Sequence, residues 1–165
     1  MDDYRKSNLE LWNNWAEINA ASSSYDVEGF KQGNVGLNSL ELAEIGDVAG
    51  KTLLHLQCHF GKDTLSWARL GATVTGADFS DNAIELARSL AAEMNIPATF
   101  IQSDLYALPK VLQGQFDIVF TSYGAISWLP DIYGWARVAS HFLKRGGTLY
   151  IADFHPFAYV LDNKE

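Results

Sequence analysis

The feature that most constrains the fold of this chain is a regular alternation, from Lys51 onward, of short apolar segments with segments of helical spacing. Strands that are separated by helices need right-handed crossover connections, which produce a parallel sheet with helices on both faces. We therefore expect an α/β fold of three layers. The five expected strands are Thr52–Gln57, Thr73–Asp78, Ala98–Gln102, Phe116–Ser122 and Thr148–Phe154. The helices expected between them are Lys62–Leu70, Asn82–Met94 and Pro130–Leu143.

The segment before this alternation divides into a helix and a loop. Residues 8–20 carry apolar side chains at helical spacings, which predicts an amphipathic helix. Residues 21–36 contain a serine cluster and several glycines, which is typical of a flexible loop. Asn38 and Glu41 have the spacing of a capping box that opens a short helix. We expect residues 1–36 to form an N-terminal helix and a candidate lid, and residues 37–165 to form the core domain.

The composition indicates a single soluble domain. A chain of 165 residues with 48% apolar residues can bury a substantial core. Its net charge of −8, from 12 basic and 20 acidic residues, disfavours nucleic acid and anionic membrane surfaces as partners. The chain has one cysteine, and its first residues lack the basic and apolar regions of a signal peptide. These two features lead us to expect a cytoplasmic protein. No segment has the continuous apolar length of a membrane span, so we expect the protein to be soluble.

The turn after the first expected strand is the natural place for a ligand site. In a parallel sheet, ligands bind beyond the carboxyl ends of the strands, where the strand order reverses. Residues 57–61 join this strand to a helix, whose first N–H groups are free to meet an anionic group. Asp78 follows about 20 residues later, the separation expected for a carboxylate that holds a ribose. Asp104 follows the third strand, where its carboxylate is suited to accept a hydrogen bond from the amino group of an adenine. An adenosine between Asp78 and Asp104 would satisfy both carboxylates.

Four segments, in the right order, resemble the class I S-adenosylmethionine-dependent methyltransferases. They are LLHLQCHFG from Leu53, GADFS from Gly76, FDIVF from Phe116 and LKRGGTL from Leu143. The resemblance covers roughly residues 50–155. It implies a Rossmann-like three-layer sandwich with a mostly parallel sheet of strand order 3-2-1-4-5. It also implies S-adenosyl-L-methionine as the cofactor and a methyl acceptor, which we expect to be a small molecule.

The first of these segments departs from the usual family motif, an acidic residue followed by spaced glycines (D-x-G-x-G-x-G). His55 stands in place of the acid, and Gln57 and His59 stand in place of the first two glycines, which leaves Gly61. The segment is similar to a subgroup that carries LQCHFG. Gln57 and His59 can offer side-chain hydrogen bonds where glycine offers only close backbone approach, or they can crowd the methionine tail of the cofactor.

The resemblance assigns a cofactor-binding role to a set of residues at the carboxyl ends of the strands and on the candidate lid. Asp78 would hold the ribose hydroxyls, and Phe79 would flank the adenine. Ser122 would lie near the sulfonium and the methionine amine. The full expected set is Tyr25, Gln57, Cys58, His59, Gly61, Asp78, Phe79, Ser103, Asp104, Leu105 and Ser122.

Two further residues are candidates for catalysis. Methyl transfer needs an in-line approach to the sulfonium methyl, so a general base is optional. Tyr123 and His155 are the better placed candidates because both follow the carboxyl ends of strands. On the N-terminal helix, we expect Trp12 and Trp15 to dock the helix onto the sheet rather than to line the ligand site.

Other functions remain open from the residues alone. His55, Cys58 and His59 superficially suggest a metal site, but strand alternation directs Cys58 away from the two histidines, so we expect no metal. A nicotinamide-dependent dehydrogenase would need a G-x-G-x-x-G turn, which residues 57–61 lack. The main alternative to an enzyme is a non-catalytic module that binds S-adenosylmethionine.

The C-terminal end of the sequence suggests an association between copies. Glu165 follows soon after the fifth expected strand, where the resembling family usually continues with a helix and an antiparallel hairpin. We expect this C-terminal antiparallel hairpin to be missing, which makes the fifth strand an apolar sheet edge. Because such an edge pairs readily with another chain, we expect either a homodimer through the fifth-strand edge or a sequence that is a truncated part of a longer chain.

Overall fold

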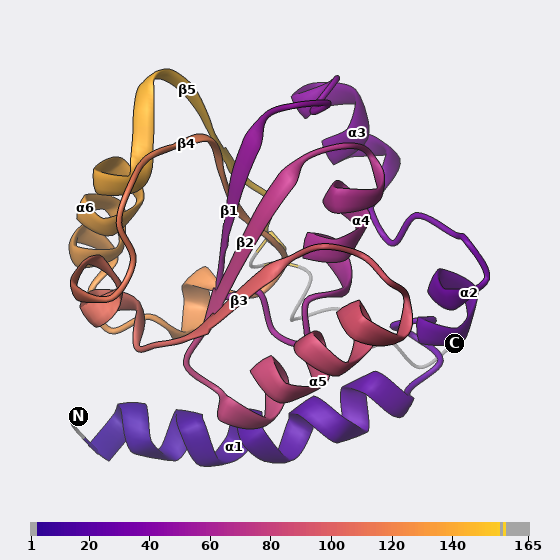
Figure 1. Ribbon diagram of the computed structural model, residues 1–165. Coiled ribbons are helices and arrows are strands. Elements are labelled where there is room, and N and C mark those ends of the chain that lie inside the picture. Colours follow the sequence, from indigo (N-terminus) through magenta and orange to yellow (C-terminus); the bar gives the residue numbers. More distant parts are fainter. Residues whose placement is uncertain (1–2, 156, 158–165) are drawn as a thin grey trace.

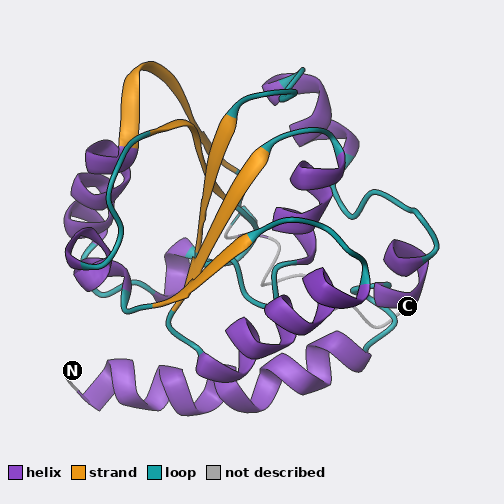
Figure 2. Cartoon of the chain, in the orientation of Figure 1, coloured by secondary structure: helices purple, strands orange, loops and turns teal. Residues whose placement is uncertain are grey.

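The computed structural model describes residues 3–155 and 157, which form a parallel sheet with helices on both faces (Figures 1 and 2). The order of the five strands is β3-β2-β1-β4-β5, and each neighbouring pair is parallel, as expected. The strands are β1 (Thr52–Leu56), β2 (Thr73–Asp78), β3 (Thr99–Gln102), β4 (Phe116–Thr121) and β5 (Leu143–Ile151). The sequence alternation therefore predicted the sheet correctly.

Helices cover the two faces of the sheet and its carboxyl edge. They are α1 (Asp3–Ala21), α2 (Val27–Lys31), α3 (Ser39–Ile45), α4 (Lys62–Arg69), α5 (Asp81–Glu93) and α6 (Ile132–Phe142), with short 3-10 helices at Leu105–Lys110 and Ile126–Trp128. In Figure 1, α1 runs beside α5 below the sheet. None of the described helices is long and apolar enough to cross a membrane.

The core lies on both sides of the central strand β1. One apolar cluster joins Leu54 and Leu56 to Trp135 and Phe142 of α6. On the opposite face, Leu53 belongs to a cluster that includes Trp67 of α4. A strand that is buried on both faces reads as a continuous apolar run, which explains the LLHL sequence of β1.

The start of the chain is packed on this core more tightly than a flexible loop would be. Residues 27–31 form the helix α2, and Phe30 is buried against Leu65 and Phe100. The expectation of an unstructured segment over residues 21–36 was therefore wrong for this part. Asn38 is the N-cap residue of α3, which ends at Ile45 as expected, but the capping box is not formed. The Asn38 side chain makes no cap hydrogen bond, and its amide lies 3.5 Å from the Glu41 carboxylate, which also accepts a hydrogen bond from Tyr123.

The last strand also differs from its expected range. β5 begins at Leu143, directly after α6, rather than after the glycine pair, and it ends at Ile151. The pairing shifts register between Phe116 and Ile118, and Gly146, with a φ of 80°, allows the irregularity that an L residue would resist. The expected homodimer through β5 stays a prediction. The expectation that the C-terminal hairpin is missing concerned the end of the chain, and residues 158–165 lie outside the described part of the structure.

A carboxylate holds the amino end of the sheet together. Asp117 of β4 accepts hydrogen bonds from the Thr52 N–H (2.8 Å) and hydroxyl (2.7 Å), and its other oxygen lies 2.8 Å from the Lys144 ammonium of β5. The Lys144 ammonium and the Thr52 donors hold the pKa of Asp117 well below its usual value. One side chain thereby links β1, β4 and β5.

We predict that Asp117→Asn lowers the melting temperature at neutral pH and has little effect in strong acid. The pKa of Asp117 is lower in the folded chain than its unperturbed value of 3.8, so its stabilisation is present above that value and is lost as the pH falls through the folded pKa. Melting curves between about pH 7 and pH 2 measure this difference. A difference in melting temperature between wild type and variant that does not change with pH would contradict the role of the charge. The exposed Glu85→Gln serves as the control.

Candidate active site

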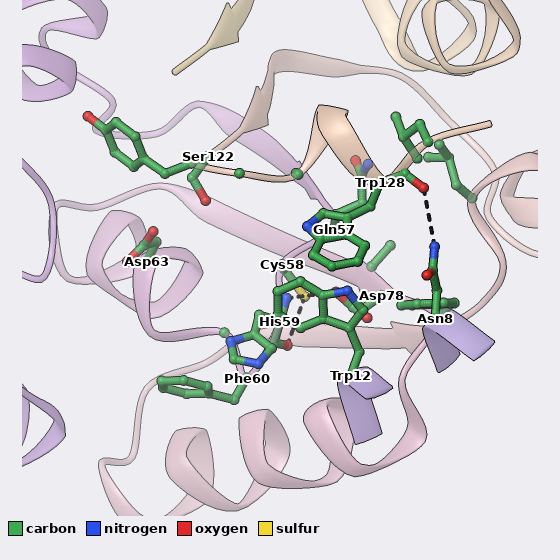
Figure 3. A pocket seen from close by; sticks show the side chains of 18 of the residues that line it. Asn8, Trp12, Gln57, Cys58, His59, Phe60, Asp63, Asp78, Ser122 and Trp128 are labelled. Carbon is green, nitrogen blue, oxygen red and sulfur yellow. Dashed lines mark hydrogen bonds between the residues drawn. The ribbon is translucent and has the colours of Figure 1, made fainter. Parts of the chain in front are cut away.

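A cavity of about 680 Å³ opens at the carboxyl ends of the strands. Its volume lies within the usual range of small-molecule sites. All the expected cofactor-binding residues line it, and so does Tyr123. Figure 3 shows Asp63 and Ser122 toward one end and Asn8 and Trp128 toward the other, with Gln57, His59 and Trp12 between them. The structure therefore brings together side chains from elements that are far apart in the sequence.

The turn after β1 keeps the backbone shape of a glycine-rich loop without its glycines. Gln57 and His59 have φ angles of 55° and 52°, in the left-handed region, and Gly61 has a φ of 76°. L residues in this region cost about 1 kcal/mol or more each. The positions that are glycine in the family motif are thus the strained positions here. Gly61 has no alternative, because an added Cβ would lie 2.6 Å from the Phe100 ring.

The Asp78 carboxylate fixes this turn to the end of β2. One oxygen accepts a hydrogen bond from the His59 N–H (2.8 Å), and the other accepts one from the Ser80 N–H (2.9 Å). Burial raises the pKa of Asp78, and these backbone donors oppose the shift. Since each carboxylate oxygen can accept two hydrogen bonds, Asp78 keeps acceptor capacity toward the cavity.

Asp104 lines the same cavity but is already engaged. Its carboxylate accepts a hydrogen bond from the Tyr106 N–H (2.9 Å), and its other oxygen lies 3.1 Å from an Arg5 guanidinium nitrogen. The ion pair connects the start of α1 to the end of β3. The sequence analysis expected the carboxylate and did not foresee the Arg5 partner.

Helix α1 closes one side of the cavity. The Asn13 amide oxygen accepts a hydrogen bond from the Ser80 hydroxyl (2.6 Å), and the Asn8 amide donates to the Trp128 carbonyl (3.4 Å), as Figure 3 shows for the second pair. The Trp12 ring lies edge-on to His59 (5.3 Å between centroids) and to Trp128 (5.5 Å). Trp12 is therefore a wall of the cavity, and the expectation that it only docks the helix was wrong.

Tyr25 extends the same aromatic wall, whereas Trp15 packs behind it. The Trp15 ring packs edge-on against Trp12, is not among the cavity residues and is 37% exposed, which agrees with a docking role. Tyr25 contacts His59 and Phe60 at 5.7 and 5.1 Å between centroids. The Tyr25 carbonyl accepts a hydrogen bond from the Lys62 ammonium at 2.8 Å. The segment before α2 is thus held against the turn after β1.

The two histidines near the turn are neutral for the same reason, burial. His55 shares hydrogen bonds with the Thr64 hydroxyl (2.9 Å) and the Ser122 hydroxyl (3.1 Å), and burial lowers its pKa to about 3. Burial lowers the pKa of His59 to about 4. The Cys58 thiol lies in an apolar cluster, and burial raises its pKa. Among the described residues, no group of three or more His, Cys, Asp or Glu side chains is arranged to hold a metal ion.

Two buried nitrogen atoms at the cavity are without a hydrogen-bond partner in the described structure. They are Nε2 of Gln57 and Nε2 of His59. The Gln57 oxygen is already used, because it accepts a hydrogen bond from the Trp135 indole (3.3 Å). Because an unsatisfied buried polar atom is costly, both nitrogens are suited to a polar ligand in the cavity.

The two expected catalytic residues have different surroundings. Tyr123 lines the cavity, but its hydroxyl donates to the buried Glu41 carboxylate (2.7 Å), and burial, followed by Glu41, raises its pKa. This geometry favours a neutral hydroxyl over a general base. His155 is exposed, stacks on Phe157 and does not line the cavity, so the expectation that its position after β5 would bring it to the site is not met.

The sequence analysis missed several residues that line the cavity. Among them are Asn8, Trp12, Asp63, Trp128, Leu129 and Pro130. The sequence contained a usable signal for Asp63. This residue is in the first turn of the helix that follows the ligand-binding turn, so its side chain starts close to the carboxyl ends of the strands. The packing of α1 against residues 126–130 had no local signal, because it depends on tertiary contacts.

Comparisons with known proteins agree with this architecture. Residues 53–147 match the methyltransferase domain family. The ubiquinone biosynthesis O-methyltransferase of Photorhabdus laumondii subsp. laumondii is 31% identical over 136 residues, which are 80% of this chain and 56% of that protein. The chain thus spans little more than half the length of the curated relatives that it matches.

Solved structures share the fold. The DhpI–SAH complex has a TM-score of 0.67 and 22% identity, over 90% of this chain and 68% of that one. A methyltransferase of Thiobacillus denitrificans in complex with S-adenosyl-L-homocysteine has a TM-score of 0.56 and 24% identity, over 70% of this chain and 48% of that one. The family match over more than half of the chain, together with the 3-2-1-4-5 sheet, shows that the chain belongs to the class I S-adenosylmethionine-dependent methyltransferases.

Proposed function

We propose that this protein transfers a methyl group from S-adenosyl-L-methionine to a small-molecule acceptor. The observation that carries the proposal is the cavity itself, which the buried Asp78, the polar side chains Gln57 and His59 and an aromatic wall line together at the carboxyl ends of β1 and β2. The family to which the chain belongs supplies the reaction class.

The residues present fit an adenosine at one part of the cavity. Asp78 has free acceptor capacity for ribose hydroxyls, and Phe79 and Leu105 offer apolar surface to a base. The Asp104 carboxylate can accept a hydrogen bond from an amino group of the base, in addition to its ion pair with Arg5. Gln57 and His59 line the cavity between its two ends, where the remaining part of the cofactor would lie.

When bound, the cofactor supplies an electrophilic methyl group on a positively charged sulfur. The contribution of the protein to such a transfer is alignment of the acceptor and exclusion of water. The aromatic side chains Trp12, Tyr25 and Trp128 line the cavity and are suited to exclude water. The hydroxyl of Tyr123, held by Glu41, is available to orient an acceptor rather than to remove its proton.

The class of acceptor rests on the relatives. The Photorhabdus protein is an O-methyltransferase of ubiquinone biosynthesis, which favours an oxygen nucleophile on a small molecule for this chain as well. The aromatic wall of the cavity agrees with an acceptor that has flat apolar surface.

Binding of S-adenosylhomocysteine by isothermal titration calorimetry tests the proposal. We expect wild type to bind it and Asp78→Ala to bind about 10–100-fold more weakly, because hydrogen bonds to a charged acceptor are worth about 1.5–3 kcal/mol. The exposed Glu85→Ala is the control and should bind as wild type does. Absence of binding by wild type to both S-adenosylhomocysteine and S-adenosylmethionine would refute the proposal.

The segment of residues 21–36 is proposed to act as a lid. Tyr25→Ala should weaken the binding of S-adenosylhomocysteine about tenfold, since the Tyr25 ring covers His59 and Phe60 at the cavity. Tyr133→Ala, which removes a tyrosine that is 77% exposed on α6 and away from this cavity, is the matched control. Equal dissociation constants for the Tyr25 variant and wild type would refute the proposal that this segment acts as a lid.

The left-handed turn can be tested by comparing His59→Gly with His59→Ala. Both variants lose the imidazole, so both should bind S-adenosylhomocysteine more weakly than wild type. Only glycine relieves the φ of 52°, so His59→Gly should be more stable than His59→Ala by about 1 kcal/mol. Thermal or urea unfolding measures the difference. An alanine variant as stable as the glycine variant, or more stable, would argue against the left-handed conformation.

A further inference from the structure

The cavity contains a carboxylate whose charge is not used by the protein. Three carboxylates line the cavity: Asp63, Asp78 and Asp104. Asp78 accepts two backbone hydrogen bonds, and Asp104 has an ion pair with Arg5. Asp63 forms no ion pair in the described part of the chain, and it lies with Ser122 at one end of the cavity.

The nearest cation does not neutralise Asp63. Lys62 precedes it, but the Lys62 ammonium donates to the Tyr25 carbonyl at 2.8 Å and lies over the Tyr25 ring. The surroundings of Asp63 are otherwise unfavourable to a negative charge. Burial raises the pKa of Asp63 to about 6, and Glu41 adds to the shift, whereas Lys62 and the Ser122 hydroxyl oppose it. A cation that enters the cavity would therefore stabilise the charged form of the Asp63 carboxyl group.

The usual family acid cannot supply this charge. The family motif has an acidic residue at position 55, where this chain has His55. His55 is buried, and both of its ring nitrogens are bonded, to Thr64 and Ser122. Ser122, the hydrogen-bond partner of His55, lies at the same end of the cavity as Asp63. The negative charge at this end of the cavity comes from Asp63, eight residues later in the sequence.

We propose that Asp63 binds the ammonium group of the amino-acid tail of the cofactor. The inference rests on the proposed function. Figure 3 places Asp63 and Ser122 together, at the opposite end of the pocket from Asn8 and Trp128. Asp104, suited to the adenine, is paired with Arg5 of the same helix as Asn8. A ligand with its base near Asp104 and its ribose at Asp78 directs its tail toward Asp63. The site is therefore matched to a nucleoside that carries a cationic amine.

Two ligands separate this role from a structural one. S-adenosylhomocysteine carries the amino-acid tail, and 5′-methylthioadenosine has the same adenosine without it. Asp63→Asn keeps the shape of the side chain and removes its charge. We expect this variant to bind S-adenosylhomocysteine about 10–100-fold more weakly than wild type and to bind 5′-methylthioadenosine within about twofold of wild type. The exposed Glu85→Gln changes the net charge equally and should affect neither ligand.

The pH dependence gives a second readout by the same calorimetry. Protonation of Asp63 removes the charge that attracts the ammonium, so the affinity of wild type for S-adenosylhomocysteine should fall as the pH falls through about 6. Asp63→Asn should lose this dependence, and 5′-methylthioadenosine should not show it with either protein. The ionisable groups that face Asp63 are Tyr25, Glu41, Cys58, Lys62 and Tyr123.

The remaining outcomes contradict one claim or the other. Equal losses for the two ligands in Asp63→Asn, or no loss for either, would overturn the role of Asp63 and leave the proposed function intact. Failure of wild type to bind S-adenosylhomocysteine would overturn the proposed function and this inference with it. Melting curves of Asp63→Asn verify that the variant is folded. The expected result is a folded variant that loses affinity for S-adenosylhomocysteine but not for 5′-methylthioadenosine.

Discussion

The candidate site depends on the two hydrogen bonds that the buried Asp78 carboxylate accepts, one from the His59 N–H and one from the Ser80 N–H. They join the turn after β1 to the start of α5, and they hold the strained turn in its left-handed conformation. Because the donors are backbone groups, the side chains of Gln57 and His59 remain available to the cavity. Backbone strain at this turn is offset by a charged acceptor, which is a common arrangement at ligand sites.

The sheet and the position of the site were predictable from the sequence because they depend on local patterns. Apolar segments alternating with helices determine a parallel sheet, and a parallel sheet places its ligand at the carboxyl ends of its strands. The residues that were missed depend on tertiary packing. The position of Trp12 follows from the docking of α1, through Asn13, on Ser80, and the early start of β5 follows from a register shift beside Phe116. No local sequence pattern contains either interaction.

The charges in the cavity explain how a changed motif can keep its ligand. Replacement of the family acid by His55 removes a negative charge and places a neutral ring in the core. Asp63 has a carboxylate at the same end of the cavity as Ser122, the hydrogen-bond partner of His55. The turn thus differs from the family pattern at three positions, the acid and two glycines, while its backbone keeps the conformation that glycines favour.

A crystal structure of the protein with S-adenosylhomocysteine tests the central claim most directly. The account predicts that the ribose hydroxyls bind the Asp78 carboxylate and that the amino-acid tail reaches the Ser122 end of the cavity. A ligand bound outside this cavity, or a nucleoside whose ribose makes no contact with Asp78, would contradict the account.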